Sequence, residues 1–320
     1  MALTTSISVG GDAAAAAVRR QLQQGRGDTA GRIFRLLLQL ALALSVVILA
    51  VLIAQVVTKG WDVLSSDLHR LVTAPLRSSA NQAGMAQGLW GSFWIGVSVV
   101  VVAFPVGIAA AIYLEEYAHK GWLTNFVNVN IRNLAGVPSV VYGILGFTIF
   151  VKALQSITGP DTNGKSVIAA GLTLAVLVLP IVIITAAEAV RAVPNGLREA
   201  GFGVGATRWE VIRTQVLPYA APGILTGTVL SLARALGEAA PLILVGAVGA
   251  RLGSEPGFFD FGALQDRFTA MPIVITEWTQ NSKKGFDELA AAGIVVMLAI
   301  VLAANSVAIL LRNRFEKKRG

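Results

Sequence analysis

The sequence predicts an all-α membrane protein with six transmembrane helices, and three observations support this fold class. Of the 320 residues, 55% are hydrophobic and only 14% are charged, with a mean hydropathy of +0.69, so the apolar residues exceed what a soluble core of this size can bury. A transmembrane helix needs about 20 mostly apolar residues. Six stretches reach or approach that length: Leu36–Val57, Leu89–Leu114, Leu134–Val151, Val167–Ala187, Pro222–Val248 and Leu289–Leu311. The third observation is that basic residues gather beside alternate spans.

The first span separates an N-terminal tail from the rest of the chain. Residues 1–33 are rich in Ala, Gly, Gln and Arg, with few large apolar side chains, and this composition predicts a disordered tail. The apolar stretch after it is longer than the core of a typical signal peptide, so we expect it to remain as an anchor. Residues 34–88 then hold the first helix and a mixed polar outer loop. The other five spans occupy 89–312, and 313–320 form a basic tail.

The distribution of positive charge predicts the orientation. With both termini in the cytoplasm, 16 of the 26 Lys and Arg residues lie on the inner side, nine lie outside and one, Arg234, lies within a span. The sequence therefore predicts a multi-pass protein of the bacterial inner membrane with cytoplasmic termini. The net charge of +8 comes from these flanking residues and not from one basic patch with aromatic side chains, which argues against nucleic acid as a partner.

Charged and aromatic residues at the ends of the spans have an ordinary interpretation. Glu115 and Glu116 follow the second span, Glu188 and Arg191 end the fourth, and all are expected to be solvated helix-end charges. The outer loop 250–286 is expected to fold over the outer mouth of the protein. It contains several Gly and Pro residues and large aromatic ones that include Phe258, Phe259, Phe261 and Trp278.

The segment Gly159–Ser166, GPDTNGKS, fits the phosphate-loop pattern G-x-x-x-x-G-K-[ST]. That pattern binds nucleotides when it follows a buried strand and opens a soluble helix, whereas here it joins two candidate spans. We therefore interpret it as an ordinary turn, and we expect no ATP, Mg²⁺ or other cofactor to be bound by this chain itself. No cysteine is present either, which excludes disulfides, thiol nucleophiles and thiolate metal sites.

The long inner loop, residues 188–221, differs from the other connections. Its pattern predicts two short helices broken at Gly205. Thr207 and Glu210 have the spacing of a capping box, in which each side chain satisfies a backbone N–H at the start of the second helix. An apolar face follows at helical spacing, and Pro218 is expected to end the helix. The residues of that face are Trp209, Ile212 and Val216, with Arg208 and Arg213 elsewhere on the helix.

This loop resembles the cytoplasmic motif of the membrane subunits of binding-protein-dependent ABC importers: E-A-A, three residues, G, nine residues, then I-x-L-P. Gly201 and Gln215 depart from the motif, while its other positions match in the correct membrane context. The resemblance implies a type I (MetI-like) importer permease fold and a loop that docks on a separate ATPase, which binds the ATP and Mg²⁺. The implied docking residues are Glu199, Ala200, Gly205, Thr207, Arg208, Trp209, Glu210, Leu217 and Pro218. The alternative is an amphipathic helix on the inner leaflet.

A charged pair interrupts the fifth span. Arg234 is near the middle of that span, where a charge costs roughly 2.5 to 3.5 kcal/mol on insertion scales, so it is expected to face the protein interior or a wet cavity. Glu238 lies one turn on, and Gly237 and Pro241 weaken the helix beside it. One interpretation is a structural ion pair, with Asn305 as a further partner. The other is an anion path, in which Arg234 binds an oxyanion while Glu238 accepts the proton of phosphate and repels sulfate.

The wider stretch from Leu197 to Ala247 resembles phosphate importer permeases, of the PstA type, whose fifth-span arginine is implicated in phosphate passage and maps onto Arg234. The resemblance implies a channel-forming subunit of a phosphate importer. It also implies a PstC-like permease partner, a PstB-like ATPase dimer, a PstS-like phosphate-binding protein and surrounding membrane lipid. The alternatives are a permease for molybdate, tungstate or sulfate, an ion-coupled secondary carrier, and a membrane scaffold.

Overall fold

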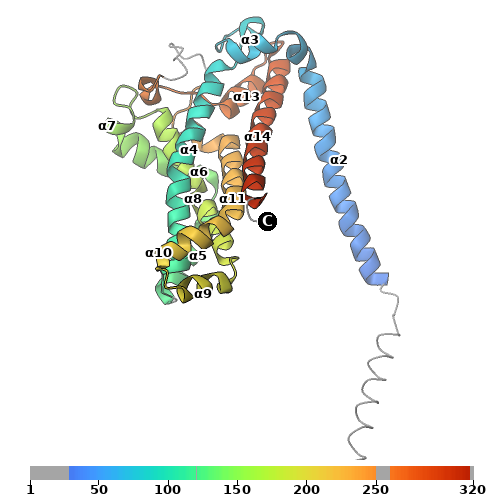
Figure 1. Ribbon diagram of the computed structural model, residues 1–320. Helices are drawn as coiled ribbons and strands as arrows, with labels where there is room; N and C mark the ends of the chain where they lie inside the picture. The colour runs from blue at the N-terminus through green and yellow to red at the C-terminus, as the bar shows by residue number, and fades with distance from the viewer. Residues whose placement is uncertain (1–28, 120, 250–259, 318–320) are drawn as a thin grey trace, which may run out of the picture. The chain divides into compact units, whose positions relative to one another are not determined.

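The computed structural model describes residues 29–119, 121–249 and 260–317. All regular elements within these ranges are helices (Figure 1), which confirms the predicted all-α class. The chain divides into two units, residues 1–55 and 56–320, and each is described by itself. Within the described residues, five helices are long and apolar enough to cross a membrane, or six if one bent pair of helices is counted as a span.

The first predicted span lies within helix α2, Thr29–Ser66. This helix begins before the predicted span and ends after it, so residues 29–33, expected in the disordered tail, are helical. The rest of that expected tail lies outside the described residues. Along residues 36–55 apolar side chains occur on all sides of the helix, a pattern typical of a helix surrounded by lipid.

The second unit is built around long helices that pack against one another. Helices α4 (Ala86–Ile112), α8 (Val167–Arg191) and α11 (Leu217–Gly237) form its centre, and α14 (Phe286–Lys317) packs against α11 (Figure 1). These helices correspond to the second, fourth, fifth and sixth predicted spans. The core between them consists of Val, Leu, Ile and Ala side chains from successive turns.

Glycines permit the close packing of these helices. A Cβ atom built on Gly107 of α4 would lie 2.6 Å from a methyl group of Val182, and one on Gly227 of α11 would lie 2.2 Å from the hydroxyl oxygen of Thr185. No ordinary Cβ contact is so short. In a membrane, where lipid is as apolar as the side chains, small residues of this kind let helix backbones approach and gain packing energy.

The third predicted span, residues 134–151, is helical over most of its length but bends sharply near its start. The amphipathic helix α5, Trp122–Ala135, ends at Gly136, and a second apolar segment runs over Ser139–Ala153 at 100° to it. That segment is α6 (Ser139–Gly146) continued by the π-helix η3 (Phe147–Ala153). The chain breaks here because Pro138 disfavours helical backbone at the residue before it and supplies the N-cap of α6.

The fifth predicted span also differs from the expectation at both ends. The short helix α10 (Arg208–Val211) passes through the π-helix η4 (Ile212–Val216) directly into α11, so Pro218 does not end a helix. Pro218 directly follows the wider turn of η4, where the regular helical hydrogen-bond pattern is already interrupted. At the other end α11 stops at Gly237, and α12 (Ala240–Leu244) begins after a two-residue break.

The segments that join the spans cluster at the two ends of the second unit (Figure 1). At one end lie α3 (Leu68–Thr73), the 3₁₀ turn η1 (Ala80–Gln82) and α13 (Met271–Gln280). Helix α13 was expected as part of an outer loop, but its apolar side is buried, and Trp278 packs on Phe286 with ring centroids 6.5 Å apart. The rest of that loop includes the 3₁₀ turn η5 (Gly262–Gln265) and Phe261, while Phe258 and Phe259 lie outside the described residues.

The phosphate-loop-like segment is a turn, as predicted. Residues 160–164 form it between the four-residue helix α7 (Gln155–Thr158) and α8, with Asn163 and Gly164 in the left-handed conformation. Ser166 then accepts a hydrogen bond from the backbone N–H of Ala169 and caps α8. The segment therefore starts a membrane helix and follows a helix instead of a strand.

Candidate functional site

The inner loop forms the two short helices that its pattern predicts. Helix α9, Asn195–Gly203, is separated from α10 by a turn in which Gly205 has a φ of +83°, a conformation that favours glycine. The predicted capping box is present: the backbone N–H of Thr207 donates to Glu210 Oε2 at 2.7 Å, and the N–H of Glu210 donates to Thr207 Oγ1 at 3.4 Å. These bonds fix where α10 begins.

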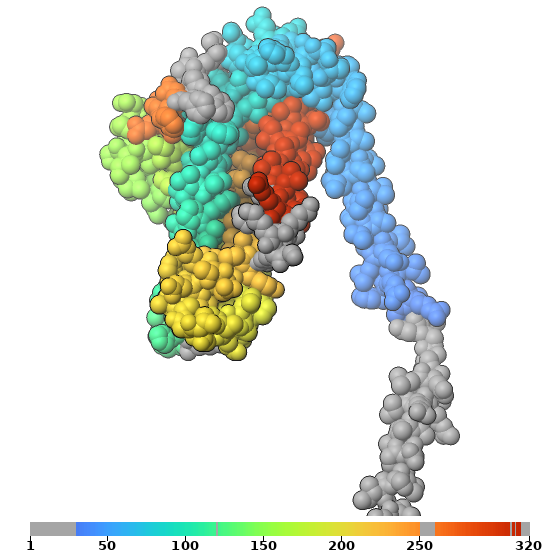
Figure 2. All heavy atoms as spheres, in the orientation of Figure 1, coloured from blue at the N-terminus to red at the C-terminus, as the bar shows by residue number. Residues whose placement is uncertain are grey.

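The predicted apolar face of α10 divides into a buried and an exposed part. Ile212 and Val216 are buried in the core, but the Trp209 residue is 54% exposed. Phe202 and Val204 are also exposed on the outside of this loop. Figure 2 shows the loop in yellow as the outer surface of the second unit at this end. Exposed apolar groups beside a polar rim are typical of a protein interface.

Most of the nine residues predicted to dock on an ATPase lie on this outer surface. Eight are exposed and one, Leu217, is half-buried; the exposed ones are Glu199, Ala200, Gly205, Thr207, Arg208, Trp209, Glu210 and Pro218. The structure also explains why Gly201 replaces the alanine of the motif. A Cβ atom there would lie 2.7 Å from a methyl group of the buried Val211, so α10 packs closer to α9 than an alanine would allow.

The glutamates at the end of α4 are ion-paired, and the prediction that they are solvated helix-end charges was wrong. They belong to a π-helix, η2 (Tyr113–Tyr117), which continues α4. The Glu115 side chain is 15% exposed and forms an ion pair with Arg191, while Glu116 is 11% exposed and lies 2.8 Å from Nη2 of Arg198. A single sequence placed the charges at helix ends but gave no sign that two arginines approach from other elements.

Arg234 and Glu238 form the predicted pair, but at a helix end and not in mid-span. The Arg234 Nε atom lies 3.4 Å from Glu238 Oε1, and the side chains are 46% and 21% exposed. Arg234 occupies the last turn of α11, and Glu238 is the C-cap residue with extended backbone. A cation at this end of a helix is favoured by the carbonyl groups that lack helical partners.

The break after α11 follows from residues that were predicted to weaken it. Pro241 lies in the first turn of α12 and cannot donate a hydrogen bond back to Gly237. Helix α12 then packs against α6 so closely that a Cβ atom on Gly143 would lie 2.8 Å from the Pro241 Cα atom. This contact holds the broken end of α11 beside the bent third segment. Asn305, considered as a further partner of Arg234, instead lines a small cavity with Phe104 of α4.

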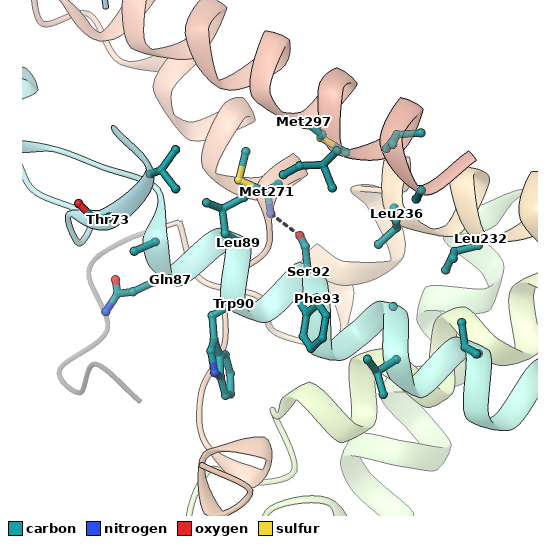
Figure 3. A pocket seen from close by; sticks show the side chains of 18 of the residues that line it. Thr73, Gln87, Leu89, Trp90, Ser92, Phe93, Leu232, Leu236, Met271 and Met297 are labelled. Carbon is teal, nitrogen blue, oxygen red and sulfur yellow. Dashed lines mark hydrogen bonds between the residues drawn. The ribbon is translucent and has the colours of Figure 1, made fainter. Parts of the chain in front are cut away.

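A large cavity lies away from the charged pair. It is an apolar groove of about 790 Å³ between α3, α4, α11, α13 and α14 (Figure 3). Leu232 and Leu236 of α11 line it, and Ser92 Oγ accepts a hydrogen bond of 2.8 Å from the backbone N–H of Met271 at its edge. Arg234 lies two residues from each leucine and therefore on roughly the opposite side of α11. The groove has little polar lining and does not suit an anion.

The described residues offer no evident metal site. They contain no group of three His, Asp or Glu side chains placed to hold a metal ion. An anion could instead be bound by the exposed guanidinium of Arg234 or by the basic residues at the two ends of the second unit.

Comparison with known sequences gives consistent relatives. The family described as "Binding-protein-dependent transport system inner membrane component" matches residues 103–319. The phosphate transport system permease protein PstA of Yersinia pestis is 33% identical over 266 residues, 82% of each chain. PstA 1 of Mycobacterium tuberculosis strain H37Rv is 31% identical over 238 residues, covering 74% of this chain and 72% of that protein. A probable ABC transporter permease of Bacillus subtilis is 29% identical over 285 residues, 87% and 94% of the two chains.

Solved structures share the fold at low sequence identity. A chain of a bacterial alginate ABC transporter, in complex with an alginate-bound periplasmic protein, superimposes with a TM-score of 0.61 at 16% identity, covering 89% of this chain and 97% of that one. A chain of the methionine ABC transporter MetNI gives a TM-score of 0.53 at 16% identity, with 72% and 95% covered. At these identities the likeness concerns the path of the chain and not its ligand.

Proposed function

Since the chain belongs to the family of inner membrane components of binding-protein-dependent transport systems and has their MetI-like fold, we propose that it is a channel-forming subunit of an ATP-driven phosphate importer. Relatives at 31 to 33% identity over most of their length are named as phosphate transport permeases, which supports phosphate as the cargo. Family membership also argues against the ion-coupled carrier and the scaffold, because neither class works with a binding protein.

The observation that carries this proposal is the open guanidinium of Arg234. The distance from Nε to Glu238 Oε1 is 3.4 Å, and the guanidinium makes no hydrogen bond in the described part of the chain. Two adjacent N–H donors in one plane match two oxygens of an oxyanion. Arg234 lies where α11 breaks, and discontinuous helices of this kind recur at transport sites.

Glu238 supplies a means of choosing between oxyanions in this proposal. Near neutral pH phosphate still carries a proton and can donate it to a carboxylate, whereas sulfate has no proton to donate and is repelled. Glu238 is 21% exposed and close to Arg234, so it reaches an anion bound there. Rejection of the wrong anion by an unfavourable charge contact is a common source of specificity.

The exposed loop of α9 and α10 is the proposed docking surface for the ATPase. Its apolar centre, Phe202, Val204 and Trp209, is exposed and flanked by charged residues, which suits a groove on another protein better than water. In this arrangement the loop is cytoplasmic and both termini lie on the same side of the inner membrane. ATP and Mg²⁺ bind to a PstB-like dimer, a PstC-like permease forms the other half of the pathway, and a PstS-like protein delivers phosphate.

Assembly and transport test the proposal together. The chain is co-expressed with the permease, ATPase and binding protein of its own transport system, purified by a tag on the chain, and reconstituted in liposomes. Recovery of the ATPase and ATP-dependent phosphate uptake are the expected results. Failure to recover an ATPase would sink the proposal. Uptake of molybdate, tungstate or sulfate in preference to phosphate would keep the importer and replace its substrate.

A further inference from the structure

Three consecutive side chains at the end of α4 each contact an arginine from a different part of the chain. Glu115 forms an ion pair with Arg191, the last residue of α8. Glu116 forms one with Arg198 of α9. The ring of Tyr117 lies under the guanidinium of Arg208, the first residue of α10, with 5.6 Å between the guanidinium carbon and the ring centroid. We call these three contacts the arginine clamp.

The Glu116–Arg198 contact is the most enclosed of the three. The side chains are 11% and 18% exposed, and Glu116 Oε1 accepts hydrogen bonds from Arg198 Nε at 3.1 Å and Nη2 at 2.8 Å. The remaining donors of Arg198 bind the carbonyl oxygens of Val190 at 2.9 Å and Val193 at 2.6 Å, with Asn195 Oδ1 at 3.4 Å. One guanidinium therefore joins the end of α4, the end of α8 and the start of α9.

The local backbone of α4 makes this contact possible. The end of α4 widens into the π-helix η2, where the N–H of Ala118 donates to the carbonyl of Tyr113 at 2.8 Å, five residues back. Such wider turns occur frequently at functional positions because they turn side chains away from the regular helical directions. Here the widened turn belongs to the segment that presents Glu115, Glu116 and Tyr117 to three different elements.

The covalent path of the chain shows why α4 needs such a contact. Residues 192–194 connect α8 to α9, and η4 connects α10 to α11 without a break. The long helices α8 and α11 are therefore linked covalently to the α9–α10 loop. Helix α4 has no such link and reaches the loop through side chains only. Four residues before Glu115, Ala111 of α4 packs with Val190 and Val211 in one buried apolar cluster. The clamp therefore joins α4 to a loop that already holds α8 and α11.

We propose that Glu116 and Arg198 are positioning residues that make α4 move together with the α9–α10 loop, so that ATPase closure reaches the second span of the pathway. This inference rests on the proposed function, because it assumes that the loop docks on an ATPase. Coupling between distant sites requires an element that both sites bias. The clamp supplies that element, because displacement of α9 pulls on the carboxylate at the end of α4.

The test compares hydrolysis with transport in the complete reconstituted complex. Glu116→Gln weakens the contact and keeps the shape of the side chain, and Tyr117→Leu removes the ring contact at a more exposed position. Both are expected to keep ATPase recovery and ATP hydrolysis while phosphate imported per ATP falls, for Glu116→Gln by about fivefold, the low end of ordinary coupling factors. Glu188→Gln is the matched control, an exposed carboxylate at the same end of the unit that acts on Arg191 only as a lesser charge beside Glu115 and forms no ion pair among the described residues, and it is expected to keep the normal ratio.

A cross-link tests whether the two elements move as one. The chain has no cysteine, so Glu116→Cys with Arg198→Cys creates a unique pair in it, and a short reducible bifunctional thiol reagent joins them in a complex whose other subunits lack cysteine. The double variant is expected to import less phosphate per ATP. Cross-linking should restore this ratio, and reduction of the cross-link should lower it again. A cross-link that blocks import would overturn the inference, because α4 and α9 would then have to separate during transport.

The outcomes separate this inference from the proposed function. A wild-type complex that does not import phosphate, or that recovers no ATPase, contradicts the proposed function and the inference with it. A wild-type complex that imports normally while both Glu116→Gln and Tyr117→Leu keep the wild-type ratio contradicts the clamp alone. If Glu116→Gln fails to assemble, Tyr117→Leu and the cross-link decide.

Discussion

Arg234 lies beside Glu238 without a hydrogen bond, with 3.4 Å between Nε and Oε1, whereas Arg198, 36 positions earlier, directs all of its nitrogens at protein oxygens. The two arginines therefore have different chemistry although both form ion pairs. Arg198 is 18% exposed and saturated, which suits a mechanical contact. The Arg234 side chain is 46% exposed and makes no hydrogen bond among the described residues, which suits a ligand that comes and goes.

Replacement of Arg234 tests the proposed anion site. Arg234→Ala is expected to lower phosphate uptake by at least about tenfold, because a hydrogen bond to a charged group is worth roughly 1.5–3 kcal/mol. ATPase recovery should not change, since Arg234 is far along α11 from the docking loop. Uptake by liposomes that contain the assembled complex measures the effect. Arg267→Ala is the control, an exposed arginine outside the spans. Normal import by Arg234→Ala would show that the pair with Glu238 is structural.

Replacement of Glu238 tests the proposed selection against sulfate. Glu238→Gln removes the negative charge and keeps a polar group of the same size, so sulfate is expected to enter while phosphate import continues. The measurement is competition: excess sulfate should inhibit phosphate uptake by the variant and not by the wild type. Equal inhibition of the two proteins would count against the carboxylate as a filter and leave Glu238 as the partner that orients Arg234.

Long apolar segments predicted the fold well, and breaks within spans were predicted less well. Five of the six predicted spans correspond to long helices, because some 20 apolar residues in a row have few alternatives in a membrane. The sequence correctly predicted the weak point at Gly237 and Pro241. It did not predict the 100° bend before Ser139, although Gly136 and Pro138 mark it, because a Gly-x-Pro segment inside an apolar run also fits a kinked helix.

Local contacts at the site were predictable from the sequence, and contacts between distant segments were not. The capping box of Thr207 and Glu210 and the pair of Arg234 and Glu238 depend on spacings of three and four residues. The Glu116–Arg198 contact joins residues 82 positions apart, and its chemistry depends on a π-turn that no residue pattern announces. A charged residue at a helix end has the same local sequence whether water or an arginine faces it.

Two glycines of α11 are expected to respond differently to the same substitution. A methyl group at Gly227 would lie 2.2 Å from the hydroxyl oxygen of Thr185, whereas one at Gly237 would meet no atom within 4 Å. Gly227→Ala should therefore destabilise the packing of α11 on α8, at a cost of about 1–3 kcal/mol typical of overpacking. Gly237→Ala should leave stability and uptake unchanged.

The melting temperature of the purified complex in detergent distinguishes the two variants. A lower value for Gly227→Ala alone is the expected result. An equally large loss of stability in Gly237→Ala would contradict the open surroundings found for that residue. Loss of uptake in Gly237→Ala without loss of stability would show that the break in α11 depends on glycine itself and not on Pro241.

The capping box of α10 gives a last prediction about docking. The Thr207 hydroxyl oxygen accepts a hydrogen bond from the N–H of Glu210. Loss of this hydroxyl leaves the N–H of Glu210, in the first turn of α10, without its capping partner. Thr207→Ala is expected to loosen the first turn of α10, which carries the exposed Trp209, and so to weaken binding of the ATPase by a few-fold. Thr214→Ala is the matched control, because that exposed threonine donates only to the Glu210 carbonyl, 2.7 Å away within its own helical segment.

Titration of the purified ATPase against the permease complex measures the difference between these threonines. Weaker binding in Thr207→Ala with normal binding in Thr214→Ala would support docking through α10. Both variants remove the same hydroxyl and methyl groups from an exposed threonine, so the difference would come from the cap. Equal binding in both would mean that the order of the first turn is not needed by the ATPase. In that case the interface would depend on α9, where Phe202 and Glu199 are the exposed groups to replace next.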